Sequence, residues 1–231
     1  MPARILDPRQ VPVTGTDQHL PALQSKLLSE RALRERFAQP ELWLPEFPGD
    51  GPALDSIREP VVAAVLLALV QRDDGLHVLL TQRTDHLRDH AGQISLPGGR
   101  SEPTDADPVA TALREAAEEV GLAPERVQVI GQLPTYTTVT NYVVTPVVAI
   151  VTPPLNWVLD TFEVAEVFEV PLQYLMTPAH HQRHVFSFDG GQRQFLSMPW
   201  RGTAADGSAR DYFIWGATAA MLRNLYGFLA R

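Results

Sequence analysis

The sequence contains no cysteine among its 231 residues. Disulfide bonds and thiolate metal sites are therefore excluded, because both need a cysteine sulfur. The absence is compatible with a reducing compartment, and we expect a cytoplasmic protein. The first ten residues also lack the apolar stretch of a secretory signal, which agrees with this expectation.

A long apolar run and a surplus of basic charge are missing too. The longest apolar run, Val61 to Val70, fits a buried strand and is too short to cross a bilayer. A net charge of −8 argues against a general nucleic-acid-binding protein, which would usually be basic. We therefore expect neither a membrane nor a nucleic acid as a partner. A hydrophobic content of 45% suits a globular protein with one sizeable core.

A well-delimited helix follows a Pro-Gly-Gly turn. Asp107 suits the N-cap position, Pro108 the first helical position and Gly121 the position after the helix. The residues between them are mostly good helix formers. The apolar stripe that would pack on a sheet consists of Ala112, Leu113, Ala116, Ala117 and Val120.

This helix carries three carboxylates, Glu115, Glu118 and Glu119. Residues three or four apart share a helix face, so Glu115 faces both of the others. Like charges at that spacing cost a few tenths of a kcal/mol per pair, which indicates a bound cation. Oxygen-only ligands favour Mg²⁺ or Mn²⁺. The alternative is a solvated acidic face on an amphipathic helix.

The neighbouring residues resemble a known motif. Residues 114–122 read Arg-Glu-Ala-Ala-Glu-Glu-Val-Gly-Leu, which matches the core of the Nudix box. Gly99 would open the box, and Asp105 stands where the general pattern has Glu, with eight rather than seven residues between it and Arg114. The resemblance to Nudix hydrolases implies an α/β (α+β) fold with a mixed β-sheet between helices. It also implies metal-dependent cleavage of a nucleoside diphosphate derivative.

A second motif resembles one that accompanies the box in coenzyme A pyrophosphatases. Its matching positions are Leu79, Leu80, Thr81, Arg83, Arg88, Gly92, Pro97, Gly98 and Gly99. Thr84 replaces a Ser or Ala of the motif, and Leu96 replaces a Phe. The resemblance implies cleavage of coenzyme A to 3′,5′-ADP and 4′-phosphopantetheine, with acyl thioesters of coenzyme A as further substrates. The alternatives are a Nudix hydrolase of a dinucleotide or nucleotide sugar, and a catalytically inactive binding module.

The acidic helix supplies the expected metal ligands. Glu115 and Glu119 are the first candidates for direct metal ligands. Glu118 is expected to be a third or water-mediated ligand and is also counted among the catalytic residues. Arg114 lies one turn before Glu118 and would orient its carboxylate through a forked ion pair, unless it makes only a surface salt bridge.

Four further residues are expected at the substrate. Arg83 and Arg88 would bind the phosphates, although either alone could be a surface charge. Gly98 and Gly99 would allow the backbone to approach the phosphates or supply a carbonyl ligand.

The general base is expected outside the box, on Glu163 or Glu166, and both could equally be solvated edge residues. Tyr212 and Trp215 are expected in the core rather than stacked on adenine.

Along the chain, residues 1–56 are expected to form an arm, a helix over residues 17–38 and a linker, all packing on a Nudix domain of residues 57–231. The helix could cap that domain or contact a second subunit in a homodimer. Strands are expected at 61–70, 77–82, 127–133, 143–151, 184–188 and 194–198. Residues 163–170 are ambiguous between helix and strand, and residues 214–230 are expected to form a final helix.

Overall fold

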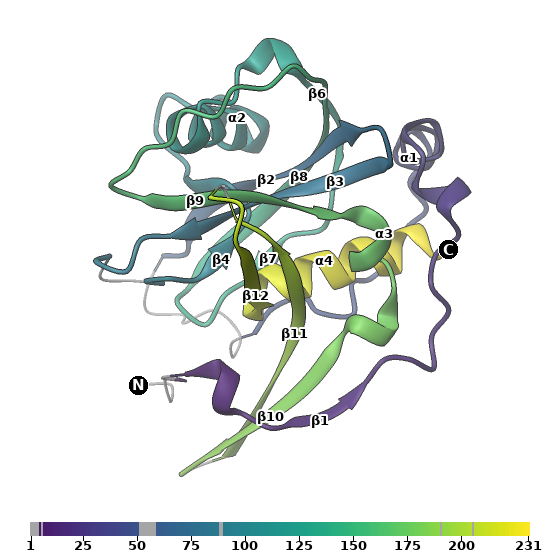
Figure 1. Ribbon diagram of the computed structural model, residues 1–231, viewed down its shortest axis with the longest axis vertical. Helices are drawn as coiled ribbons and strands as arrows, with labels where there is room; N and C mark the ends of the chain where they lie inside the picture. The colour runs from purple at the N-terminus through teal and green to yellow at the C-terminus, as the bar shows by residue number, and fades with distance from the viewer. Residues whose placement is uncertain (1–4, 6, 51–58, 88–89, 190, 205) are drawn as a thin grey trace.

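The fold of this chain, taken from a computed structural model, is a mixed β-sheet with helices on both faces and a second, smaller sheet beside it (Figure 1). The structure describes all residues except 1–4, 6, 51–58, 88–89, 190 and 205. The strands are β1 (Val13–Thr16), β2 (Val61–Arg72), β3 (Gly75–Arg83), β4 (Ile94–Ser95), β5 (Gly98–Arg100), β6 (Val127–Gln132), β7 (Tyr136–Thr137), β8 (Tyr142–Val151), β9 (Val164–Pro171), β10 (Gln182–Phe188), β11 (Gly191–Thr203) and β12 (Ala209–Trp215). The helices are α1 (Glu30–Ala38), α2 (Pro108–Val120), α3 (Leu172–Leu175) and α4 (Gly216–Leu229), with 3₁₀ turns η1 (Pro8–Gln10), η2 (Ser25–Leu28), η3 (Pro124–Arg126) and η4 (Pro178–His180).

The larger sheet has the order β4-β3-β2-β8-β6, with β5 beside β2, β7 beside β8 and β9 beside β3. Its central pair, β2 and β8, is parallel, whereas the strands that flank this pair run antiparallel to it. The expected mixed sheet between helices is therefore confirmed.

Strand β2 divides the core because its side chains alternate between the two faces of the sheet. Ala64, Leu66 and Ala68 pack with the alanine-rich face of α2. Ala63, Leu67 and Leu69 belong to the cluster on the opposite face, which includes residues of α4 and of the smaller sheet. Both faces are covered, which explains why β2 is a continuous apolar run.

The caps expected for α2 are confirmed. The Asp107 carboxylate accepts a hydrogen bond from the Ala110 N–H at 2.8 Å, and Pro108 opens the helix. Gly121 ends it in the left-handed conformation, with φ of 67°. The direction and the end of α2 are therefore fixed by local chemistry.

Residues 17–38 pack on the rest of the chain, but the first half of this range is not the helix that was expected. Of residues 17–38, only α1 is an α-helix, preceded by the 3₁₀ turn η2. Asp17 is fully buried and pairs with Arg183 at 2.5 Å and Arg223 at 3.3 Å, while the Leu23 N–H donates to the Met176 carbonyl at 3.1 Å. These tertiary contacts hold the chain extended where its leucine spacing predicted a helix.

The remaining elements largely follow the sequence pattern. The hairpin expected around Asp189 is present, with Phe188 paired to Gly191. The ambiguous residues 163–170 form strand β9, which pairs with β3. Strand β12 was not expected; it takes the first two residues assigned to the final helix, which begins at Gly216. Among the described residues, no helix is both long and apolar enough to span a membrane.

The N-cap of α2 leads to a stability prediction. We expect Asp107→Ala to lower the free energy of unfolding by about 1 kcal/mol, because the Ala110 N–H loses its acceptor. For a chain of this size the melting temperature would fall by roughly 2–4 °C, which differential scanning calorimetry can resolve. Asp107→Asn is the matched control and should melt close to the unmodified protein, since Asn caps equally well. An unchanged melting temperature for Asp107→Ala would contradict this account.

Candidate active site

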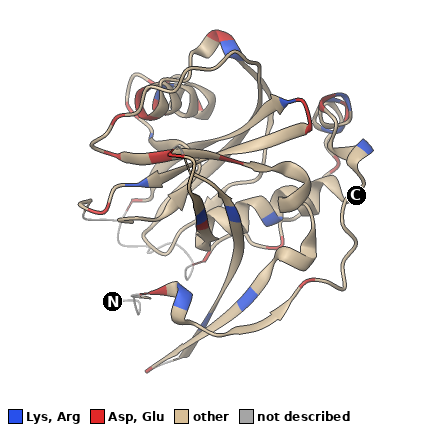
Figure 2. Ribbon diagram, in the orientation of Figure 1, with Lys and Arg blue, Asp and Glu red and all other residues tan. Residues whose placement is uncertain are grey.

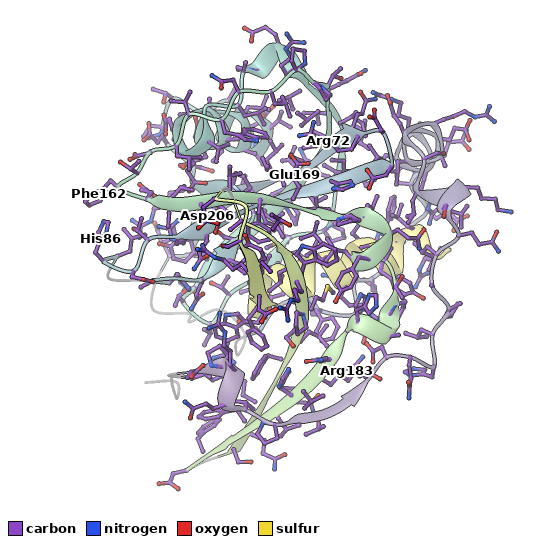
Figure 3. The ribbon with its side chains drawn as sticks, in the orientation of Figure 1. Arg72, His86, Phe162, Glu169, Arg183 and Asp206 are labelled. Carbon is purple, nitrogen blue, oxygen red and sulfur yellow. The ribbon has the colours of Figure 1, made fainter. Side chains whose placement is uncertain are left out.

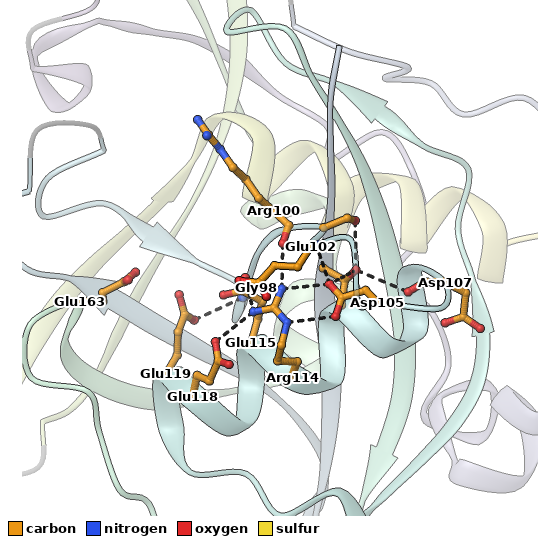
Figure 4. Close-up of polar contacts among 12 residues, drawn as sticks. Gly98, Arg100, Glu102, Asp105, Asp107, Arg114, Glu115, Glu118, Glu119 and Glu163 are labelled. Carbon is orange, nitrogen blue, oxygen red and sulfur yellow. Dashed lines mark hydrogen bonds and ion pairs between the residues drawn. The ribbon is translucent and has the colours of Figure 1, made fainter. Parts of the chain in front are cut away.

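The Gly98–Gly99 turn lies in close contact with β2 and α2. A Cβ atom on Gly98, whose φ is 154°, would come within 2.4 Å of the Ala64 carbonyl oxygen. A Cβ on Gly99 would come within 2.5 Å of a carboxylate oxygen of Glu115. The two glycines therefore allow the first carboxylate of α2 to lie directly against the backbone of β5 (Figure 4).

Arg114 organises the exposed side of this acidic cluster. Its Nε and Nη2 donate to the two oxygens of Asp105 at 3.1 and 3.0 Å. Its Nη1 lies 3.0 Å from both Glu115 and Glu118 (Figure 4). One guanidinium thus holds three carboxylates in fixed relative positions.

Asp105 anchors Arg114. Its side chain is only 6% exposed and also accepts hydrogen bonds from the Glu102 N–H and the Thr111 hydroxyl, each at 2.9 Å. The hydrogen bond with Arg114 is the largest effect that lowers the pKa of Asp105 below its usual range. The acid at the variant position of the box therefore supports the arginine, a role that the sequence did not reveal because the spacing departs from the general pattern.

Glu119 is the most buried of the three carboxylates, at 4% exposure. It accepts a hydrogen bond from the Gly98 N–H at 3.3 Å and lies 3.6 Å from Arg83 Nη1. These contacts are too few to offset burial, which raises the pKa of Glu119 to about 8. Burial also raises the pKa of Glu115, against the opposing effect of Arg114.

Arg83 lies at the end of β3, between Glu119 and Glu163. Its Nη2 is 3.4 Å from the Glu163 carboxylate, so both of its ion pairs are long. Its Nε is buried and has no hydrogen-bond partner. An anion entering the site would find unused donor capacity on this side chain.

The two expected candidates for the general base occupy different surroundings. Glu163 precedes β9, is 42% exposed and faces Arg83. Glu166 is 7% exposed and accepts hydrogen bonds from the Tyr212 hydroxyl at 3.0 Å and from Arg210. The structure therefore brings Glu163 to the acidic cluster and binds Glu166 to strand β12.

The carboxylate oxygens of this cluster are of the type that a hard divalent cation prefers, but they do not point to one common position. In the part of the chain that the structure describes, no three His, Asp or Glu side chains stand at metal-binding spacing. Each carboxylate of α2 instead has a guanidinium within 3.6 Å. The donors are all oxygens, which a hard cation prefers, and burial raises the pKa of Glu115 and of Glu119.

Two other sequence expectations remain, for Arg88 and for Tyr212. Arg88 lies outside the described residues. Tyr212 is buried, as expected, and stacks on Phe168 with ring centroids 3.8 Å apart. In Figure 2 the ribbon is red, the colour of Asp and Glu, at positions of α2 and along β9 and the segment before it.

Comparison with known proteins agrees with this architecture. A family model described as the NUDIX domain matches residues 60–190, and the chain belongs to the Nudix hydrolase family. It is 47% identical over 165 residues to proteins named "Uncharacterized Nudix hydrolase NudL" from Salmonella paratyphi B and Salmonella newport, which covers 71% of this chain and 80% of theirs. Nudix hydrolases generally use divalent metals such as Mg²⁺ or Mn²⁺ and act on small nucleotides.

Solved structures with a similar arrangement include an Ap4A hydrolase of C. elegans in a binary complex. It is 21% identical and covers 51% of this chain and 85% of its own, with a TM-score of 0.43. A MutT/nudix family protein from Enterococcus faecalis is 15% identical and covers 88% of this chain and 75% of its own, with a TM-score of 0.44.

The close approach at Gly99 predicts a strong and local effect of substitution. In Gly99→Ala, the new Cβ would displace the Glu115 carboxylate, and we expect catalytic activity to fall by about 10²-fold while the fold is retained. Circular dichroism and steady-state kinetics would measure the two properties. Gly15→Ala is the matched control, because no heavy atom lies within 4 Å of its Cβ position. Full activity in Gly99→Ala would show that Glu115 need not lie against the turn.

The raised pKa of Glu119 predicts how stability depends on pH. Between the ordinary value of 4.5 and about 8, the folded protein keeps a proton that the unfolded chain has released. The unfolding free energy of metal-free protein should therefore fall as the pH rises through this window. A carboxylate must be ionised to ligate Mg²⁺, so the stabilisation by Mg²⁺ bound through Glu119 would grow over the same window.

Thermal melts between pH 5 and pH 8, in chelator and in Mg²⁺, would measure this dependence. Glu119→Gln removes the titrating group and should reduce the slope. An effect of Mg²⁺ that is the same at both ends of the window would contradict the assignment.

Proposed function

We propose that this protein is a divalent-metal-dependent pyrophosphatase that hydrolyses coenzyme A to 3′,5′-ADP and 4′-phosphopantetheine. The observation that supports hydrolysis of a phosphoanhydride is the acidic cluster of α2, in which Glu115 lies against the Gly98–Gly99 turn and the buried Glu119 lies next to Arg83. The choice of coenzyme A rests on the motif resemblance of residues 79–99. Acyl thioesters of coenzyme A are proposed as further substrates.

Glu115 and Glu119, with Glu118 as the third or water-mediated ligand, would hold the metal. The ion, when bound, neutralises phosphate oxygens and lowers the pKa of a coordinated water. Arg114 contributes by keeping Glu115 and Glu118 in position, since both carboxylates lie 3.0 Å from its Nη1. Asp105, which grips the other side of the same guanidinium, preserves that geometry.

Arg83 is proposed to bind the diphosphate. Its buried Nε is without a partner and its two ion pairs are long, so a phosphate oxygen can bind without breaking a strong contact. A guanidinium binds phosphate through a fork of parallel N–H donors, which also fixes the orientation of the substrate. Arg88 of the same motif is proposed as a second phosphate ligand. Together they would offset the repulsion between a net charge of −8 and a polyanionic substrate.

Glu163 is proposed as the general base. It is partly exposed, and it lies within reach of Arg83 beside the acidic helix, so its carboxylate can accept a proton from the attacking water. Glu166 was an equal candidate from the sequence. Its carboxylate is already engaged by Arg210 and Tyr212, which favours a structural role in joining β9 to β12.

These assignments predict different kinetics for the two glutamates. With Mg²⁺ or Mn²⁺ and coenzyme A, Glu163→Gln should lower kcat by about 10²- to 10⁴-fold, the usual contribution of a general base. Glu166→Gln is the matched control, and its main effect should be on the melting temperature. Chromatography of the products gives the rates. Equal kcat values in unmodified protein and Glu163→Gln would remove Glu163 from the catalytic set.

The substrate is tested separately with a panel. Coenzyme A, acyl-coenzyme A, a dinucleotide and a nucleotide sugar should be assayed side by side, because the box contacts only the diphosphate that all of them share. If another nucleotide is turned over rapidly and coenzyme A gives no 3′,5′-ADP, coenzyme A is rejected as the substrate, while the proposed hydrolase activity stands. If the unmodified protein binds metal but hydrolyses none of these compounds, the result would instead favour a catalytically inactive binding module.

A further inference from the structure

Two aromatic side chains at the edge of the acidic cluster remain open to solvent. Phe162 is 66% exposed, although burial of a phenylalanine ring is normally favourable. The exposed His86 ring lies beside it, with ring centroids 4.9 Å apart and planes inclined at 59°. Figure 3 shows both rings on the same side of the molecule, near the start of β9. The pair is called the aromatic rim below.

The backbone under the aromatic rim is held firmly. The Phe162 N–H donates to the Asp160 carboxylate at 2.9 Å, and the Phe162 carbonyl accepts from the Thr84 hydroxyl at 2.8 Å. The Thr84 N–H also donates to the Glu163 carbonyl at 2.9 Å. The Phe162 ring is therefore presented by a backbone whose polar groups are satisfied, and its exposure does not come from a loosely attached loop.

The same loop is tied to the acidic helix. The Asp160 N–H donates to the Glu119 carbonyl at 3.0 Å, and the Val158 N–H donates to the Val120 carbonyl at 3.0 Å. On the other side, Thr84 directly follows Arg83 in the sequence, and Phe162 directly precedes Glu163. Phe162 of the aromatic rim is thus adjacent in sequence to Glu163, and His86 stands three residues after Arg83, the ion-pair partner of Glu163.

We propose that Phe162, supported by His86, is a stacking platform for the aromatic base of the nucleoside diphosphate substrate. The inference rests on the proposed function, in which Arg83 binds the diphosphate. A substrate anchored there carries its nucleoside outward from the buried acidic cluster, where an open ring face is available on the rim. Every nucleobase has a π face, so stacking adds affinity and does not depend on the hydrogen-bonding groups of a particular base.

Binding of two probes to the full-length protein with Mg²⁺ tests this proposal. ADP carries a base and a diphosphate, and inorganic pyrophosphate carries the diphosphate alone. In isothermal titration calorimetry, Phe162→Ala should weaken ADP binding by about 5- to 100-fold, the usual cost of removing a stacked aromatic, and leave pyrophosphate within about twofold. His86→Ala should weaken ADP binding less, because the Phe162 ring remains.

Two control variants separate stacking from effects on the loop. Phe162→Trp keeps an aromatic face and should keep ADP affinity. Val158→Ala shortens another exposed apolar side chain of the same loop, 63% exposed, and should change neither probe. Unchanged ADP affinity in Phe162→Ala would overturn the proposal, and so would an equal loss for ADP and pyrophosphate.

Proton NMR gives an independent measurement that also works for weak binding. The adenine H2 and H8 resonances of ADP should shift upfield with the unmodified protein, through the ring current of Phe162, and not with Phe162→Ala. The same shift in both proteins would overturn the platform. Failure to hydrolyse coenzyme A, with Phe162-dependent ADP binding, would reject the substrate and retain the platform. If the unmodified protein and Phe162→Ala hydrolyse coenzyme A with the same KM, the proposed substrate is retained and the stacking platform is rejected.

Discussion

Burial of negative charge against a glycine turn is the constraint on which the site depends. The alanine face of α2 packs so closely on the sheet that Glu115 and Glu119 contact the backbone of β5. Ionised carboxylates are unfavourable there unless cations accompany them. Arg114 supplies positive charge on the exposed side, and Arg83 supplies it more weakly on the buried side. A divalent cation, of the kind that Nudix hydrolases generally use, would add positive charge at this position.

Strand β9 and the loop before it connect the region of the acidic helix with the smaller sheet. Glu163 faces Arg83 near the acidic helix, whereas Glu166, three residues later, is held by β12. The loop is hydrogen-bonded to the end of α2 through Asp160 and to the end of β3 through Thr84. Thr84, a departure from the resembled motif, therefore has a clear structural task, because its hydroxyl fixes the Phe162 carbonyl.

Local patterns predicted α2 well because each of its signals acts within a few residues. Asp107, Pro108 and Gly121 determine where the helix begins and ends, whatever the helix packs against. The segment from Asp17 to Leu23 was mispredicted for the opposite reason. Its conformation depends on Arg183 and Arg223, more than 150 residues away in the sequence, and no local pattern reports that distant pairing.

By itself the sequence determined that three acids lie on one side of α2, since residues three or four apart share a helix face. It also determined that Gly98 and Gly99 stand where the box begins, at positions without a side chain. Only the tertiary structure decided which distant groups join them. Whether Glu163 or Glu166 meets the acidic cluster, and which acid anchors Arg114, depend on how strands and loops fold together. Such long-range contacts are fixed by packing over the whole sheet, so spacing along the chain does not encode them locally.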